Sequence, residues 1–260
     1  MRFVRCALAC LAVLGTVVLG AVAESSAAIY VIDTGVTSFS ASPKSQLTGL
    51  GYTVNSGGAL ANYSGYEQVW DLRYNANLSG TDTTAMEAYL QSGGRMYLTG
   101  EHNGFDASRN NSLLGFLNAT GAGPVSLVAN TNFSGTQTFT TEGQALNSPT
   151  TLAGVNFFAG RVVSETGQGF LVTQTGLVPG QGSLLAWDFG DITGKESARM
   201  IVGFDHEMFG STPGGLVGNF ASFLGATTVA PEPATLVMWS LGMAGIGVVG
   251  WRRRRKAHAL

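Results

Sequence analysis

Residues 93–119 read GGRMYLTGEHNGFDASRNNSLLGFLNA, and this stretch decides the fold. It contains a short apolar strand, Arg95–Thr99, and then a polar loop with a glycine at each end, Gly100–Gly104. A helix follows over Asn111–Ala119. A strand that runs through a glycine-bounded loop into a helix is typical of a βαβ unit.

Further helices and short strands lie on both sides of this unit. Thr81 or Asp82 is the expected N-cap of the helix before it, and Pro43 lies in the first turn of the earliest helix. Helices are predicted over 42–50, 81–91 and 214–224, and strands over 29–32, 52–54, 68–72, 125–128, 155–158, 161–165, 170–175, 184–189 and 199–204.

The two halves of the chain differ in how the strands are connected. Up to Ala119 strands alternate with helices of about ten residues, which indicates parallel pairing. From Val125 onward short strands are separated by Gly-rich turns, which indicates antiparallel pairing. The sequence therefore predicts an α/β fold: a flavodoxin-like parallel sheet with helices on both faces and antiparallel additions in the second half.

Acidic residues and histidines follow several predicted strands directly. In an open parallel sheet, ligands bind beyond the carboxyl ends of the strands. We therefore expect ligand-binding residues at Asp33, Asp71, Asp205 and His206, and catalytic candidates at Glu101 and His102.

Histidine beside carboxylates can bind a divalent metal or act as an acid/base pair. His102, Asp205 and His206 are the candidate metal ligands, and no other cofactor is expected. No H-E-x-x-H motif is present. The alternative is structural, because polar residues at strand ends also cap helices and satisfy loop backbone groups.

The loop Gly100–Gly104 has the G-x-x-x-G frame of a nucleophile elbow. Together with the preceding helix, strand 95–99 and the final strand and helix, 199–224, it resembles the class I glutamine amidotransferase-like superfamily. In the catalytic families the central residue of this elbow is cysteine, so the resemblance implies that His102 occupies the nucleophile position. Both cysteines, Cys6 and Cys10, lie near the N-terminus. Thiol chemistry is thereby excluded, and a non-catalytic relative is the favoured interpretation.

The N-terminus has the pattern of a secretory signal peptide, assigned to residues 1–23. Arg2 and Arg5 precede an apolar run over 6–19, and small residues follow at a cleavage site for signal peptidase. A second cleavage pattern ends at Ala28. A buried N-terminal helix is the alternative interpretation.

The C-terminus combines three features in order over residues 229–256. The triplet Pro231, Glu232, Pro233 is followed by an uncharged run, 234–251, whose helix would rise about 27 Å against a hydrocarbon core of ~30 Å. Basic residues end the segment: Arg252, Arg253, Arg254, Arg255 and Lys256. Because basic clusters stay cytoplasmic, the domain lies across the membrane.

The triplet distinguishes this segment from a plain tail anchor. Triplet, span and arginine cluster resemble the PEP-CTERM signal, which the membrane protease exosortase recognises. The resemblance implies a Gram-negative, exopolysaccharide-producing host and cleavage near the triplet. It also implies transient membrane anchoring before the protein reaches the cell surface or the extracellular space.

Between these ends, residues 28–228 form one domain large enough for a substantial core. The region from Ala28 to Pro231 has 7 basic and 14 acidic residues, hence a net charge of −7. Nucleic acid is excluded as a partner, since binding it requires clustered Lys and Arg.

Two functions follow from these features. The first is a non-enzymatic surface or matrix protein that binds a ligand such as exopolysaccharide, with aromatic rings at Tyr63, Tyr66, Trp70 and Tyr74 available for stacking on sugars. For Trp70, packing in the core explains the residue equally well. The alternative is a metal-assisted hydrolase acting on an extracellular polymer, with Glu101 as the base.

Overall fold

A computed structural model describes residues 28–33, 37–102, 104–105, 107–212 and 214–225. The predicted signal peptide and the C-terminal segment with its span lie outside the described residues. Among the helices of the described ranges, none has the length and apolar character needed to cross a membrane.

The first half of the domain alternates strands and helices as predicted. Its elements are β1 (Ala28–Ile32), α2 (Thr37–Gly49), β2 (Thr53–Gly57), β3 (Gln68–Asp71), α3 (Gly80–Gln91), β4 (Arg95–Thr99) and α4 (Ala107–Ala119). The second half consists of β5 (Val125–Phe139), η1 (Glu142–Leu146), β6 (Val155–Thr166), β7 (Phe170–Gln174), β8 (Leu184–Trp187), β9 (Arg199–Gly203), α5 (Met208–Ser211) and α6 (Leu216–Gly225).

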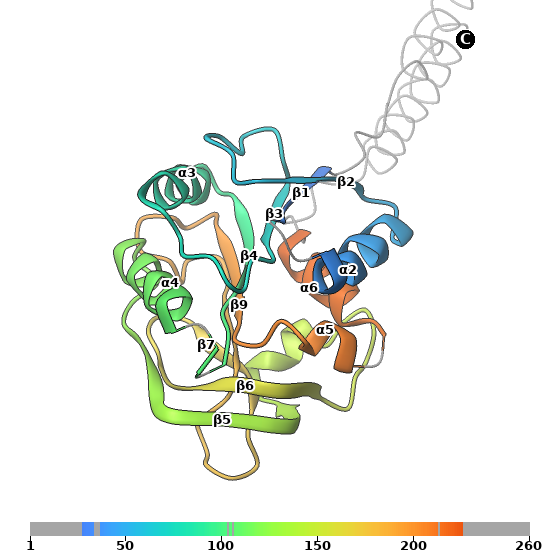
Figure 1. Cartoon of the computed structure of the whole chain (residues 1–260), viewed down its shortest axis with the longest axis vertical. Coiled ribbons are helices and arrows are strands. Elements are labelled where there is room, and N and C mark those ends of the chain that lie inside the picture. The colour runs from blue at the N-terminus through green and yellow to red at the C-terminus, as the bar shows by residue number, and fades with distance from the viewer. Residues whose placement is uncertain (1–27, 34–36, 103, 106, 213, 226–260) are drawn as a thin grey trace, which may run out of the picture.

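The strands form one sheet of nine in the order β2-β1-β3-β4-β9-β8-β7-β5-β6. Strands β2, β1, β3, β4 and β9 pair in parallel, and the remaining pairs are antiparallel. The predicted fold class is confirmed. β9, the last strand in the sequence, therefore lies beside β4, near the middle of the sheet (Figure 1).

Helices cover both faces of the sheet, as expected, because β4 alternates its side chains between two buried clusters. Met96 and Leu98 pack with residues of α3 and α4 on one face. Tyr97 packs with residues of α2, α5 and α6 on the other. Figure 1 shows the same division, with α3 and α4 together on one side and α2, α5 and α6 on the other.

Two helix starts differ from their predictions. The N-cap of α3 is Ser79, whose hydroxyl oxygen accepts the Asp82 N–H at 3.2 Å while the Asp82 carboxylate accepts the Ser79 N–H at 3.0 Å. This reciprocal capping box explains why neither Thr81 nor Asp82 is the cap. α2 begins at Thr37, so Pro43 lies inside the helix and not in its first turn.

In the antiparallel half, β5 and β6 are longer than predicted, whereas β7 and β8 end one and two residues earlier than predicted. β5 continues to Phe139, and the two predicted strands 155–158 and 161–165 are one strand, β6. Gly160 was expected to separate them, but a Cβ there would lie 2.7 Å from the Phe157 ring. This glycine permits close packing and does not end the strand. Register shifts along the β5–β6 pair absorb the extra residues.

A buried ion-pair network holds the chain that follows β3. Arg73 donates two hydrogen bonds to Asp71, at 2.8 and 2.9 Å, and Arg109 lies 3.3 Å from the same carboxylate. Arg73 also contacts Asp82 at 3.1 Å. Burial by itself would raise the pKa of Asp71, but the charges of Arg109 and Arg73 and the hydrogen bonds from Arg73 hold it below its ordinary value. The network thereby joins β3, α3 and α4.

We predict that Asp71→Asn destabilises the protein by about 3–5 kcal/mol at neutral pH, because the buried guanidiniums of Arg73 and Arg109 lose the charge of a partner that they share. A lowered pKa adds stability above the unfolded value of 3.8, and this stability is lost as the pH falls through the folded value. Urea unfolding below about pH 4 should therefore show a weaker pH dependence in the variant than in the unaltered protein.

Glu196→Gln is the control, because Glu196 is exposed and the substitution also removes one negative charge. Equal stability of Asp71→Asn and the control at neutral pH would contradict the assigned role of the network.

Candidate functional site

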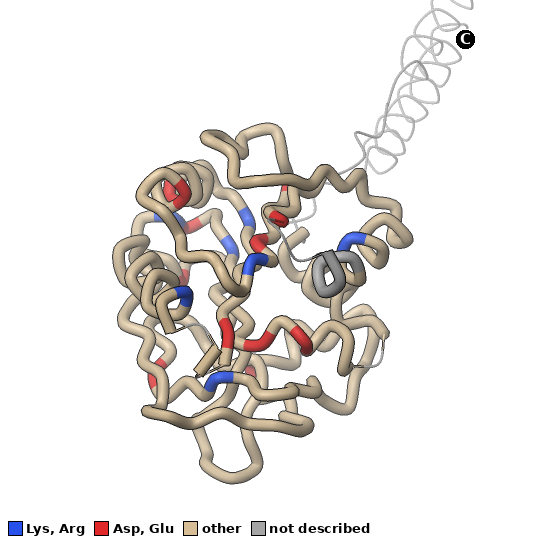
Figure 2. Tube along the Cα trace, viewed as in Figure 1, with Lys and Arg blue, Asp and Glu red and all other residues tan. Residues whose placement is uncertain are grey.

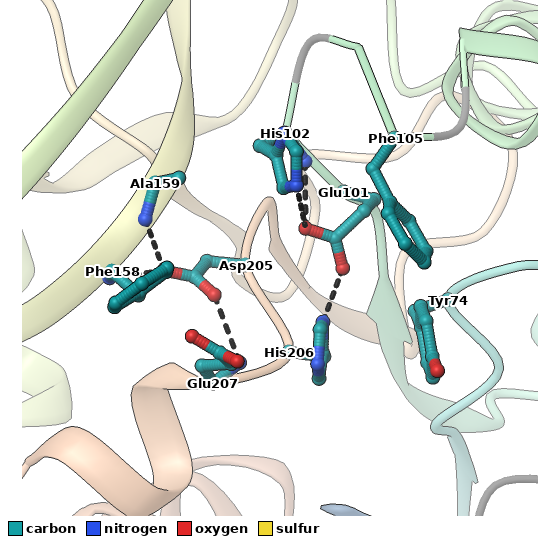
Figure 3. A pocket seen from close by; sticks show the side chains of 9 residues that line it. All are labelled: Tyr74, Glu101, His102, Phe105, Phe158, Ala159, Asp205, His206 and Glu207. Carbon is teal, nitrogen blue, oxygen red and sulfur yellow. Dashed lines mark hydrogen bonds and ion pairs between the residues drawn. The ribbon is translucent and has the colours of Figure 1, made fainter.

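The ends of β4 and β9 bring two distant loops together. Thr99 pairs with Gly203, and the Gly100 N–H donates to the Gly203 carbonyl at 2.8 Å, which extends the parallel contact by one residue. Glu101 and Asp205 each lie two residues beyond the strand ends. They line a pocket of ≈ 180 Å³ (Figure 3). The pocket residues are Tyr74, Glu101, His102, Phe105, Phe158, Ala159, Asp205, His206 and Glu207.

Glu101 is held from both its backbone and its side chain. The Asn110 side chain accepts the Glu101 N–H at 2.8 Å and donates to the Glu101 carbonyl at 2.6 Å. Oε1 of Glu101 accepts the His102 N–H at 2.8 Å, and Oε2 pairs with Nδ1 of His206. With 1% of its surface exposed, Glu101 is a buried carboxylate in a fixed orientation.

Asp205 is equally buried and is fixed by backbone donors. Its Oδ2 accepts the N–H of Phe158 at 2.6 Å and of Ala159 at 3.3 Å, and its Oδ1 accepts the N–H of Glu207 at 2.8 Å. Burial, the largest cause, and the nearby charge of Glu101 raise the pKa of Asp205 above its ordinary value, although the N–H donors lower it. The loop after β9 and strand β6 together therefore position this carboxylate.

The two histidines differ in their surroundings. His206 stacks on Tyr74 with ring centroids 4.2 Å apart and an interplanar angle of 16°. His102 has 31% of its side chain exposed, and its Nε2 lies 4.0 Å from Oε1 of Glu101. His206 is therefore clamped between a ring and a carboxylate, whereas His102 stands at the rim.

Exposed phenyl rings flank these polar groups. Phe105 is 53% exposed and lies 5.4 Å from Tyr74, and Phe158 is 67% exposed. Figure 3 places Phe105 and Tyr74 on one side of the pocket and Phe158 on the other, with Glu101 between them. The pocket thus combines apolar walls with a polar base.

The structure brings together four of the predicted site residues, namely Glu101, His102, Asp205 and His206. The other two do not line this pocket: Asp71 belongs to the buried arginine network, and Asp33 pairs with Lys44 of α2. A ligand-binding role for Asp33 and Asp71 stays a prediction. The described Lys and Arg positions are dispersed over the domain and form no single basic face in Figure 2.

The predicted sugar-stacking rings were largely wrong. Tyr63 and Trp70 are fully buried in the core, and Tyr66 is partly buried against Tyr30. Core packing is therefore the correct interpretation of Trp70. Of the four rings, only Tyr74 lines the pocket.

Three residues of the site were missed. Strand alternation was the signal for Phe158. Val155 and Phe157 are buried, so the alternate positions, which include Phe158, face away from the core. Phe105 lies in the loop directly after the G-x-x-x-G frame, where an apolar residue has no core position to fill. No local signal identifies Asn110, since its partner Glu101 is nine residues away.

The C-terminal segment matches a known sequence motif. Residues 229–255 match the PEP-CTERM protein-sorting motif. The PEP-CTERM motif indicates an exported protein that exosortase sorts to the cell surface. The match covers the three sequence features from the triplet to the arginine cluster, and it does not extend into the domain. No curated protein matches the chain.

Solved structures resemble the domain in fold. The mmIFT52 N-terminal domain aligns with a TM-score of 0.56 at 13% identity, covering 78% of this chain and 99% of that domain. At this identity the similarity establishes the fold alone. Exo-beta-1,4-mannosidase Op5Man5 from Opitutaceae bacterium strain TAV5 aligns with a TM-score of 0.45 at 11% identity, covering 72% of this chain and 33% of the enzyme.

The glycines that bound the elbow loop act in different ways. Gly104 has φ of +96°, a conformation that disfavours side chains, and nothing lies within 4 Å of its added Cβ. A Cβ on Gly100 would lie 2.5 Å from the Phe204 ring and 3.0 Å from the Asn110 side-chain oxygen. Packing therefore requires glycine at position 100, next to Asn110, whose side chain holds the Glu101 backbone.

We predict that Gly100→Ala destabilises the protein by about 1–3 kcal/mol, because the added methyl group overpacks the Phe204 contact. Gly115→Ala is the matched control: Gly115 lies inside α4 with open space around its Cβ, so alanine should stabilise the helix by about 0.5–1 kcal/mol. Thermal unfolding of both variants measures the difference, and a stabilising Gly100→Ala would contradict the packing argument.

Proposed function

We propose that the mature protein is a cell-surface or matrix-associated binding protein whose pocket takes a saccharide unit of an extracellular polysaccharide. The observation that carries this proposal is the placement of two exposed phenyl rings, Phe105 and Phe158, beside buried and oriented polar groups. The sorting motif supports it, because the motif is typical of proteins that are exported and sorted to the cell surface.

The chemistry of the pocket suits a sugar. Sugar rings present apolar C–H faces, which pack on aromatic side chains, and hydroxyl groups, which donate to carboxylates. Glu101 and Asp205 supply oriented acceptor oxygens at the base, and His102 supplies a polar group at the rim. The volume of ≈ 180 Å³ is smaller than the roughly 300–1,000 Å³ of pockets for drug-sized ligands, so one sugar unit is the expected occupant.

The resemblance to class I glutamine amidotransferases supports binding over catalysis. The chain has cysteine only at positions 6 and 10, within the predicted signal peptide, so the mature domain lacks the thiol of the catalytic families. His102 occupies the corresponding place in the loop. The imidazole is partly exposed and stands beside the pocket, where it can contact a ligand.

A metal-assisted hydrolase of an extracytoplasmic polymer is the second candidate. It is favoured by the meeting of the two loops, since Glu101 of one pairs with His206 of the other. Release of reducing ends from the polymer distinguishes the two functions. A binding protein leaves the polymer intact and releases no reducing ends. A hydrolase releases them, and it loses this activity when Glu101 is replaced by glutamine.

We predict that Phe158→Ala weakens binding to the purified exopolysaccharide of the host about tenfold, which corresponds to the loss of about 1.4 kcal/mol of ring packing. Leu177→Ala is the matched control, because Leu177 is an exposed apolar residue that does not line the pocket. Affinity electrophoresis measures both. If the polysaccharide does not change the mobility of the unaltered protein, or if the two variants lose affinity equally, the proposal is contradicted.

The sorting step has its own prediction. Replacing Pro231, Glu232 and Pro233 by alanine should leave the C-terminal segment attached and the protein in the inner membrane. The unaltered chain in a host that lacks exosortase should accumulate in the same form. Immunoblots of membrane and extracellular fractions measure how the protein divides between them. Normal release of the triple variant would contradict the assignment of the cleavage region.

A further inference from the structure

The base of the pocket holds a compact group of three potential metal ligands. Glu101, Asp205 and His206 each offer one ligand atom, and these atoms all lie within 4.8 Å of one another. They come from the loops after β4 and β9, so the parallel pairing of these strands fixes their separation. The group therefore has the spacing of a single ion site.

No lysine or arginine balances the charge of this group. Glu101 and Asp205 are 1% and 2% exposed, and within the described ranges Glu101 pairs only with histidines, while Asp205 forms no ion pair. The similarly buried Asp71 has two arginine partners, at 2.8 and 3.3 Å. Buried charges in proteins are paired or coordinate metals, and two carboxylates that share one imidazole leave room for a cation.

Backbone donors orient both carboxylates and leave acceptor capacity. The His102 N–H binds Oε1 of Glu101, so Oε2 remains directed at His206. Among the described residues, Oδ1 of Asp205 accepts one hydrogen bond, from the Glu207 N–H, and each carboxylate oxygen has two lone pairs. Ligating carboxylates are typically held by such hydrogen bonds.

A second observation lies beside His206. Thr99 is 1% exposed, and its hydroxyl group lies beside the buried hydroxyl group of Tyr97, with no further hydrogen-bond partner for either within the described part of the chain. Together with His206 it lines a small cavity of ≈ 10 Å³. A buried hydroxyl group in this position offers a polar partner to whatever binds against the imidazole.

We infer that Glu101, Asp205 and His206 form a binding site for one divalent transition-metal ion, with an open coordination position facing the pocket. The inference deepens the proposed function and rests on its pocket, because a saccharide hydroxyl would reach the ion there. Glu101 takes the place of His102 in the ligand set expected from the sequence. His102 stands at the rim, where it contacts the incoming ligand.

The donor set favours zinc or manganese over calcium or magnesium. Two carboxylate oxygens and one imidazole nitrogen match the three protein ligands of an open zinc site, and manganese accepts the same donors. Calcium requires six to eight oxygen ligands, and magnesium keeps several waters and rarely takes imidazole. Of the four ions, we therefore expect Zn²⁺ and Mn²⁺ to bind most tightly.

The test is a metal titration of the full chain, purified in detergent and stripped with chelator, by isothermal calorimetry. The probes are Zn²⁺, Mn²⁺, Mg²⁺ and Ca²⁺ without any saccharide. We expect one equivalent of Zn²⁺ or Mn²⁺ to bind, and Glu101→Gln, Asp205→Asn and His206→Ala each to weaken its affinity at least about tenfold. Circular dichroism establishes which variants fold, and those that fold decide the result.

Glu196→Gln is the matched control, because the substitution removes the same charge, but Glu196 is exposed and lies outside the pocket and the group of three. It should bind the ion as the unaltered protein does. Absence of binding to the unaltered protein, or equal losses in Glu196→Gln and Glu101→Gln, would overturn the inference.

Saccharide binding is measured separately on chelator-stripped and metal-loaded protein. Metal binding without saccharide binding upholds the ion site and contradicts the proposed function. Saccharide binding by a protein that takes up no metal contradicts the ion site and leaves the proposed function standing.

Discussion

The parallel pairing of β4 with β9 is the constraint on which the rest of the site depends. These strands are joined in register from Arg95 with Arg199 to Thr99 with Gly203, although about a hundred residues separate them in the chain. Side chains two residues beyond paired strand ends must lie near one another. The contact between Glu101 and His206 follows from this register, and so does the position of Asp205 beside them.

Two buried acidic clusters in the same domain are stabilised in different ways. Asp71 is neutralised by Arg73 and Arg109, and the result is a rigid connection between β3 and the helices that pack near it. Glu101 and Asp205 are stabilised by backbone N–H groups, the Asn110 side chain and His206. Hydrogen bonds orient a carboxylate without cancelling its charge, so this second cluster retains a capacity to bind cations or hydroxyl groups.

The antiparallel half of the domain completes the pocket. β6 donates the N–H groups of Phe158 and Ala159 to Asp205, and the Arg161 N–H donates to the Phe204 carbonyl at 2.9 Å. The same strand presents the Phe158 ring to solvent. A strand outside the five parallel strands therefore supplies both the orientation of a buried carboxylate and one apolar wall.

The sequence by itself determined most of the local elements and the C-terminal sorting motif. The βαβ unit around 93–119 could be predicted because its strand, loop and helix are each specified by contiguous residues. The sorting motif is linear and was recognised in the same way. β6 was predicted as two strands, because glycine is common in turns, whereas Gly160 permits close packing against Phe157.

Only the tertiary structure decided which polar residues act together. Asp33, Asp71, Glu101 and Asp205 all lie at or just beyond the ends of strands, and nothing in the sequence separates those with lysine or arginine partners from those without. Strand order and register place Arg73 and Arg109 at Asp71, whereas the described partner of Glu101 from the other loop is His206 and not a lysine or arginine. The physical reason is that ion pairing and burial depend on contacts between residues far apart in the chain, which local sequence does not encode.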